Sequence, residues 1–76
     1  MQTQITPKIR VSTAAIYYEE MWGNRFQYET FCFSDDPVQK TFQVIHGSYY
    51  KCDFHYLKKA IKVHRYIANN LKRKYR

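Results

Sequence analysis

The sequence predicts an α+β fold in which a small three-stranded antiparallel β-meander is followed by one long amphipathic C-terminal helix. Three observations lead to this prediction: two strand-like runs flank a Gly-Asn pair, a third follows a turn sequence, and the apolar residues of the C-terminal stretch recur every three or four positions. A chain of 76 residues has room for a single domain. We assign residues 8–46 to the antiparallel sheet, 53–75 to the basic amphipathic helix and 1–7 to a flexible N-terminus.

The first hairpin is predicted around Gly23-Asn24. Residues 15–22 and 25–33 on either side are rich in β-branched and aromatic side chains, and glycine at the first central position suits a type II′ turn. A helix over residues 13–22 is the competing interpretation, which the turn and the aromatic residues after it disfavour. The turn would place opposite one another Trp22 and Arg25, Met21 and Phe26, Glu19 and Tyr28, Tyr17 and Thr30, and Ile16 and Phe31.

The third strand and the helix follow in order. Residues 34–37, Ser-Asp-Asp-Pro, are turn formers, and residues 41–46 are a third strand-like run that ends at Gly47-Ser48. Asp53 is a candidate N-cap for the helix. No Gly or Pro interrupts the apolar stripe that comes next, which consists of Phe54, Leu57, Ala60, Ile61, Val63, His64, Ile67, Ala68, Leu71 and Tyr75.

The composition is that of an ordered globular domain. Hydrophobic residues make up 45% of the chain and aromatic residues 18%, with only two glycines and two prolines. We therefore expect an aromatic core, in which the sheet face toward the helix buries most of Trp22, Phe26, Phe31, Phe33 and Phe42.

Charge is distributed unevenly along the chain. Residues 51–76 hold nine of the thirteen Lys and Arg residues against one acid, Asp53, so this segment has a net charge of +8 while the first fifty residues carry −1. A basic segment on a nearly neutral body indicates a polyanionic partner.

On the predicted helix the basic residues recur three and four apart beside the apolar stripe, and such a row is able to follow a phosphate backbone. The competing interpretation is the solvated polar face that any amphipathic helix needs. The candidate contacts with nucleic acid or another polyanion are Lys58, Lys59, Lys62, Arg65, Lys72, Arg73, Lys74 and Arg76.

Tyrosines are a second group of candidate contacts, since exposed aromatic rings stack on unpaired bases. Core packing is the default role of aromatic residues, and we expect the phenylalanines and Trp22 to take it. The tyrosines left as candidates for exposure are Tyr17, Tyr18, Tyr49, Tyr50 and Tyr66.

The predicted order of three strands and a helix, with Trp22-Gly23 at the first hairpin, resembles in layout the plant ethylene-response-type and integrase N-terminal DNA-binding domains. Those families read the major groove with a basic sheet. The sheet predicted here carries Glu19, Glu20 and Glu29, whose charges repel phosphates. The resemblance therefore implies nucleic-acid binding in which the helix, and not the sheet, makes the contacts.

We expect a protein that is not an enzyme, because no catalytic constellation is evident. Adjacent strand residues such as Glu19 and Glu20 point to opposite faces and do not converge on one substrate. Cys52 and His55 lack an orienting third group, and no Gly-rich phosphate loop is present.

Two cysteines are too few for a disulfide framework, and we expect both thiols to be reduced. On paper, Cys52 and His55 combine with Cys32 and His46 into a set of two Cys and two His ligands for zinc. Closed zinc sites usually consist of two close pairs of ligands, whereas thirteen residues separate Cys32 from His46. We therefore expect no metal site and no cofactor.

The sequence thus favours a small non-enzymatic protein that binds nucleic acid or another polyanion through phosphate contacts of its C-terminal helix. The alternative is a phage or mobile-element inhibitor of a host defence nuclease, of the anti-CRISPR or anti-restriction type, that acts by protein–protein binding. Tyr and Arg are favoured at such interfaces.

The expected partners are nucleic acid, an acidic protein surface or a host nuclease complex, and the open edges of a three-stranded sheet are also compatible with a homodimer. No apolar run reaches the roughly 18 residues of a membrane span, so we expect no membrane partner. Residues 1–7 lack the basic and apolar regions of a signal peptide, which predicts a cytoplasmic protein.

Overall fold

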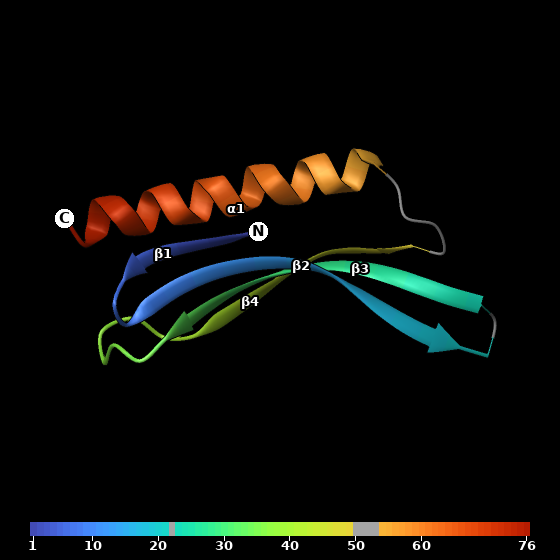
Figure 1. Cartoon of the computed structure of the whole chain (residues 1–76), viewed down its shortest axis with the longest axis horizontal. Helices are drawn as coiled ribbons and strands as arrows, with labels where there is room; N and C mark the ends of the chain where they lie inside the picture. The colour runs from blue at the N-terminus through green and yellow to red at the C-terminus, as the bar shows by residue number, and fades with distance from the viewer. Residues whose placement is uncertain (22, 50–53) are drawn as a thin grey trace.

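In the part of the chain that the structure describes, four antiparallel strands form one sheet and a helix packs along one of its faces (Figure 1). A computed structural model describes residues 1–21, 23–49 and 54–76, the side chains at positions 20, 24–26, 47–49 and 54–56 excepted. The predicted α+β class, the antiparallel sheet and the C-terminal helix are confirmed. In sequence order, which is also the order in the sheet, the elements are β1 (Gln2–Thr6), β2 (Ile9–Glu20), β3 (Gly23–Ser34) and β4 (Phe42–Tyr49), followed by α1 (Phe54–Lys74).

The prediction of three strands is wrong, because residues 1–7 contain a further strand and are not a flexible N-terminus. β1 pairs antiparallel with β2, and Gln2 lies opposite Ser12 and Thr6 opposite Ile9. Four of the five residues of β1 are Gln or Thr, so hydrophobicity gave no strand signal there. Residues 2–6 form a strand because the edge of the long strand β2 offers unpaired backbone groups with which they pair. The sheet therefore extends beyond the predicted 8–46 at both ends.

The predicted hairpin between the first long strands exists, but its register is wrong. Thr30 lies opposite Thr13 and not opposite Tyr17, and β3 already begins at Gly23, which pairs with Glu20. The two registers differ by four residues, an even number, so both place every side chain on the same face and alternation alone does not distinguish them. Gly23 has a φ of 138°, a conformation that glycine adopts readily. The pairing predicted for Trp22 lies outside the described residues, and the competing helix over 13–22 is wrong.

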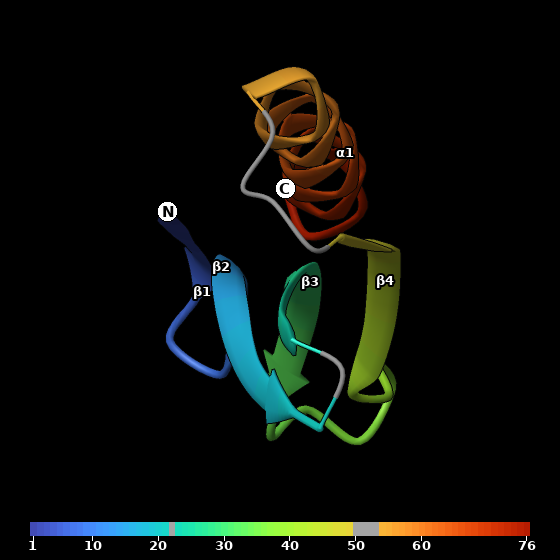
Figure 2. The same ribbon diagram turned by 90° about the vertical axis from the view of Figure 1, so that its right-hand side faces the viewer.

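The apolar stripe of the helix is confirmed. Ala60, Ala68 and Leu71 are buried. Ala68 and Leu71 pack with Ile9, Val11 and Cys32 of the sheet, and Ile67 and Tyr75 are partly buried beside them. Figure 2 shows α1 lying over one face of the four strands. The candidate N-cap, Asp53, lies outside the described residues.

The expectation of an aromatic core is wrong for Phe31 and Phe33. Apart from Tyr28, the described core consists of aliphatic, small and polar side chains. Phe31 and Phe33 alternate with the buried Cys32, so they lie on the sheet face turned away from α1. There their rings stack with centroids 5.3 Å apart, and Phe33 is 39% exposed. Phe42 packs at the edge of the core, whereas Trp22 and the side chain of Phe26 are not among the described parts of the chain.

A row of hydrogen-bonded polar side chains crosses the interface between the sheet and the helix. The Nε2 atom of His64 lies 2.8 Å from Oγ1 of Thr3, and its Nδ1 atom lies 2.8 Å from Oγ1 of Thr13. Thr13 is bonded to Thr30 at 2.6 Å, and Thr30 to Nε2 of His46 at 2.7 Å. This polar chain takes one side chain from each of the five elements and so holds α1 at one position over the sheet.

The polar chain is satisfied when both imidazoles are neutral. A neutral imidazole donates from one nitrogen and accepts at the other, and each threonine hydroxyl donates once, so donation runs in one direction from end to end. One added proton is accommodated by reversing some donors. When both His46 and His64 are protonated, a hydroxyl hydrogen of Thr13 or Thr30 has no acceptor within the polar chain. Burial lowers the pKa of both histidines, and nearby positive charges lower it further.

Candidate nucleic-acid interface

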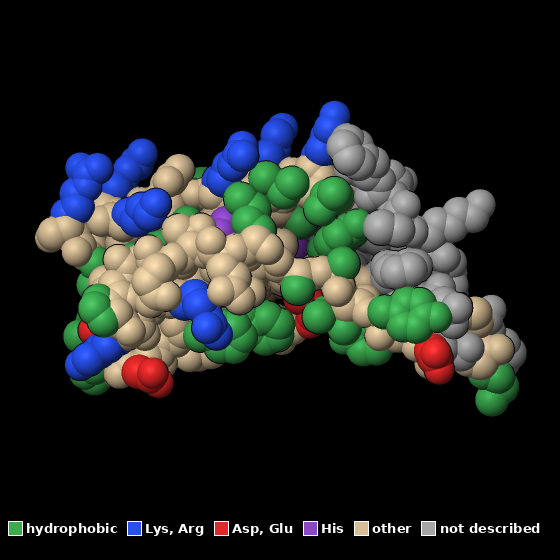
Figure 3. Space-filling view, in the orientation of Figure 1, with side chains coloured by type: hydrophobic (Ala, Val, Ile, Leu, Met, Phe, Trp, Pro, Cys, Tyr) green, Lys and Arg blue, Asp and Glu red, His purple; other side chains and the backbone are tan. Residues whose placement is uncertain are grey.

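The side chains predicted to contact a polyanion are exposed on α1 and at the residues that follow it. The apolar stripe turns the opposite side of the helix to solvent, which is why basic residues three and four apart gather there. At 1.5 Å per residue, Lys58 and Lys74 are about 24 Å apart along the axis. Figure 3 shows basic side chains projecting along the helix edge of the molecule. The cationic surface comprises Lys58, Lys59, Lys62, Arg65, Lys72, Arg73, Lys74 and Arg76.

The cationic surface consists of two clusters. Residues 58–65 form the first and residues 72–76 the second, and about two helical turns, or ~10 Å, separate Arg65 from Lys72. The exposed residues in the interval are uncharged: Tyr66, Asn69 and Asn70.

The side chain of Lys74 turns toward the sheet. Its ammonium group donates a hydrogen bond of 3.1 Å to Oε1 of Gln39 in the β3–β4 connection, and it lies 5.4 Å from the centre of the Tyr75 ring. Lys74 therefore helps to hold the end of α1 on the sheet, and the remaining cations form the outward part of the surface.

The helix concentrates positive charge without internal compensation, since α1 contains no Asp or Glu. Lys58 and Lys62 are four residues apart, a spacing at which like charges destabilise a helix by about 0.2–0.5 kcal/mol per pair. The three basic residues of the last turn, Lys72, Arg73 and Lys74, are favoured by the negative end of the helix dipole. That explanation does not reach residues 58–65, because the dipole acts only on the terminal turns.

The carboxylates that repel phosphates lie on the sheet, as the sequence predicted. Glu29 alternates with the buried Thr30 and so faces away from α1. It is only 5% exposed, and its carboxylate accepts hydrogen bonds from the amide of Gln43 and, at 3.4 Å, from the hydroxyl of Tyr18. An anion that approaches the cationic surface thus meets no carboxylate on the helix.

The candidate tyrosines are dispersed, and one of them lies on the cationic surface. Tyr66 is 70% exposed on α1, whereas Tyr17 is 48% exposed on β2. Tyr18 is half-buried beside Glu29. The side chain of Tyr49 is not described, and Tyr50 lies outside the described residues.

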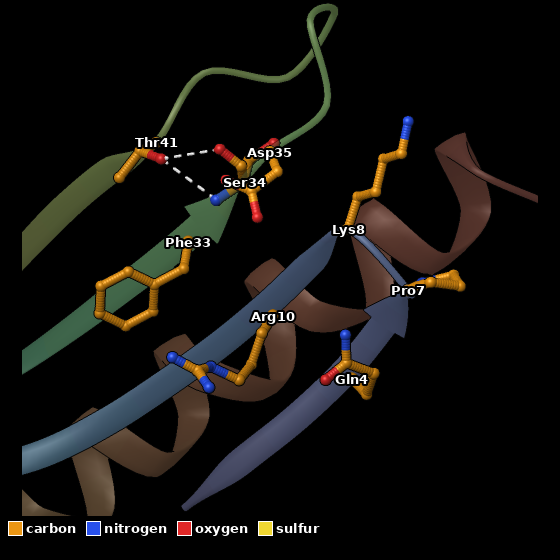
Figure 4. A pocket seen from close by; sticks show the side chains of 8 residues that line it. All are labelled: Gln4, Pro7, Lys8, Arg10, Phe33, Ser34, Asp35 and Thr41. Carbon is orange, nitrogen blue, oxygen red and sulfur yellow. Dashed lines mark hydrogen bonds between the residues drawn. The ribbon is translucent and has the colours of Figure 1, made fainter.

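A shallow pocket of about 320 Å³ lies where β2 begins and β3 ends, on the sheet face turned away from α1 (Figure 4). The guanidinium carbon of Arg10 lies 4.9 Å from the centre of the Phe33 ring in its wall, and Thr41 exchanges hydrogen bonds with the backbone of Ser34. Because it opens on the opposite face, the pocket does not extend the cationic surface. Its lining residues are Gln4, Pro7, Lys8, Arg10, Phe33, Ser34, Asp35 and Thr41.

The candidate zinc ligands are not brought together in the described part of the chain, where no three His, Cys, Asp or Glu residues form a cluster able to hold a metal ion. Cys32 is fully buried in the core, and burial raises the pKa of its thiol, an effect that the charge of Lys74 partly offsets. Cys52 lies outside the described residues, and the side chain of His55 is not described. Among the described helical residues, none form a stretch long and apolar enough to cross a membrane.

Comparison of the chain with protein-family models, curated protein sequences and solved structures finds no match. The layout resemblance to DNA-binding domains of three strands and a helix thus gains no support from known structures, and the fourth strand departs from that layout.

Proposed function

We propose that the protein binds nucleic acid through phosphate contacts made by the cationic surface of α1. The observation that carries this proposal is that all eight basic residues of this surface are exposed, seven on a helix without an acid and one just after it, while the carboxylate of Glu29 faces the other way. Lysine and arginine that neutralise phosphates release condensed counterions, which drives binding without any need for base readout.

The dimensions of the surface suit a run of consecutive phosphates. Phosphates of one strand in a duplex are about 3.4 Å apart along the axis, so the ~24 Å between Lys58 and Lys74 spans about seven of them. If the seven cations other than Lys74 take part, the slope of log K against log salt is about −5 for a single strand. Affinity is then expected to fall about 10³-fold between about 50 and about 200 mM salt.

Charge reversal tests whether the helix makes the contacts. We expect Lys62→Glu combined with Arg65→Glu to abolish binding of labelled oligonucleotides in a fluorescence-anisotropy titration. The matched control is Lys8→Glu combined with Lys40→Glu, which changes the net charge equally at two exposed residues in turns of the sheet. An equal loss in both double variants would mean that overall charge, and not the helix, drives binding.

The alternative, an inhibitor that binds a host nuclease, makes a different prediction in the same assay. A protein complex that depends on a few aromatic anchors is less sensitive to salt than phosphate binding. If the wild-type protein binds neither DNA nor RNA at about 50 mM salt, the proposal of nucleic-acid binding is overturned.

A further inference from the structure

We infer that the nucleic acid bound by the cationic surface is single-stranded, and that an unpaired base stacks on the ring of Tyr66. This inference rests on the proposed function and adds to it the class of nucleic acid and the residue that selects it.

Tyr66 is exposed to a degree that the fold does not explain. It keeps 70% of its surface in solvent, and within the described part of the chain no hydrogen bond or ring contact involves it. Buried aromatic side chains contribute strongly to stability, and an aromatic ring on the solvent side of a helix forgoes that contribution. Removal of this ring is therefore expected to leave the fold intact.

The position of Tyr66 relates it to the two cationic clusters. Lys62 precedes it by one helical turn, and Arg73 follows it by two. A strand that runs along the helix axis and places phosphates on both clusters must cross the uncharged interval between them, where the ring lies. Proteins that bind single strands combine these two elements, a basic track for the backbone and an aromatic platform for a base.

The neighbours of Tyr66 in the interval add polar contacts at the right distance. Asn69 and Asn70 are three and four residues further on, so their amides lie on the same side of the helix, one turn away. An amide both donates and accepts hydrogen bonds and is able to bond the edge of a stacked base.

A single strand fits this arrangement better than a duplex. Stacking requires the face of a base, and in a duplex the neighbouring base pairs cover both faces. Helices that read a duplex present polar side chains to base edges in the major groove, where a tyrosine ring has no base face to cover. Tyr18, another of the candidate tyrosines, is bonded to Glu29 on the opposite face of the sheet.

The experiment compares ligands with the same phosphates and different bases. Labelled oligonucleotides of about 12 nucleotides, within the usual site size, are titrated as single-stranded DNA, single-stranded RNA, fully abasic DNA and duplex DNA. We expect the wild-type protein to bind the base-bearing single strands about 5- to 150-fold more tightly than the abasic strand, as one stacked base gives.

Two variants identify the residue. Tyr66→Ala is expected to bind base-bearing and abasic strands equally and to keep the salt dependence of the wild type, because the phosphate contacts are unchanged. Tyr66→Phe, which keeps the ring, is expected to retain the preference for bases. The melting temperatures of both variants, followed by circular dichroism, should match that of the wild type.

The outcomes separate the inference from the proposed function. Equal binding of abasic and base-bearing strands by the wild type, with a steep salt dependence, overturns the inference and leaves the proposed function standing. Tighter binding of the duplex than of either single strand, or an unchanged preference for bases in Tyr66→Ala, also overturns it. Absence of binding to all four ligands overturns both.

Discussion

Acid is expected to destabilise this fold through the two histidines of the polar chain. His64 is fully buried and His46 is 9% exposed. Burial is the main cause that lowers the pKa of each, and positive charge adds to it: Lys59 acts on His46, while the N-terminal ammonium group and Arg65 act on His64. The unfolded chain takes up protons near pH 6.5, whereas the folded chain takes them up only at lower pH. Stability is therefore complete above about pH 6.5 and falls as the pH decreases.

The magnitude follows from linkage. One proton held by the unfolded state alone corresponds to a slope of about 1.4 kcal/mol per pH unit, so two histidines give about 2.7 kcal/mol per pH unit until the folded chain takes up its first proton. The slope then falls to about 1.4 kcal/mol per pH unit. The polar chain accommodates one added proton by reversing some of its donors, but it does not accommodate a second. Compared with the 5–15 kcal/mol typical of small domains, a fall of about 2 kcal/mol between about pH 7 and about pH 5.5 is large.

The assay is urea unfolding followed by circular dichroism between about pH 7 and about pH 5.5, a range in which histidine is the side chain that titrates. The His55→Gln background removes the third histidine of the chain from this window. We expect the further change His64→Phe to lower the stability at pH 7 and to halve the slope. Stability that is constant or rises on acidification would refute the reasoning, and so would an unchanged slope in the variant.

Two further substitutions test the core. Thr30→Val, at a position with no exposed surface, keeps the shape of the side chain but interrupts the polar chain, and we expect a loss of about 1–3 kcal/mol for each partner left unsatisfied in urea unfolding. A loss below 0.5 kcal/mol, the lower limit for one net hydrogen bond, would show that the polar chain does not stabilise the fold. In a Cys52→Ser background, Cys32 should react with a thiol reagent only as fast as the protein opens, because burial both shields the thiol and raises its pKa. Reaction at the rate of an exposed cysteine would contradict the burial of Cys32.

The elements with a strong local pattern could be predicted from the sequence. The apolar positions of the helix repeat every three or four residues over five turns, and they set both its bounds and the direction of its basic side chains. The register of β2 and β3 could not, because a shift of four residues preserves the alternation of faces. β1 was missed because its residues are mostly polar and its pairing depends on a distant edge.

Parts of the candidate site could likewise be predicted from the sequence, and other parts could not. The basic residues were predictable, since helical spacing alone places them together. The sequence did not predict that Tyr66 and Tyr18 lie on opposite sides of the sheet, because this depends on which sheet face each strand residue occupies. The polar chain was missed because Thr13, Thr30 and His46 have no mutual spacing in sequence. A signal was present in hindsight: His64 interrupts the apolar stripe, and a buried imidazole needs polar partners.

The bond between Thr3 and His64 joins residues 61 positions apart, whereas each strand of the sheet pairs with the strand next to it in sequence. A ribosome releases the chain from its N-terminus, so β1 to β4 emerge while α1 is still being made. Until α1 appears, the apolar face that contains Ile9 and Val11 has no cover. The sheet therefore gains its cover only after all four strands have been made, and until then it depends on rapid completion or on a chaperone to stay out of aggregates.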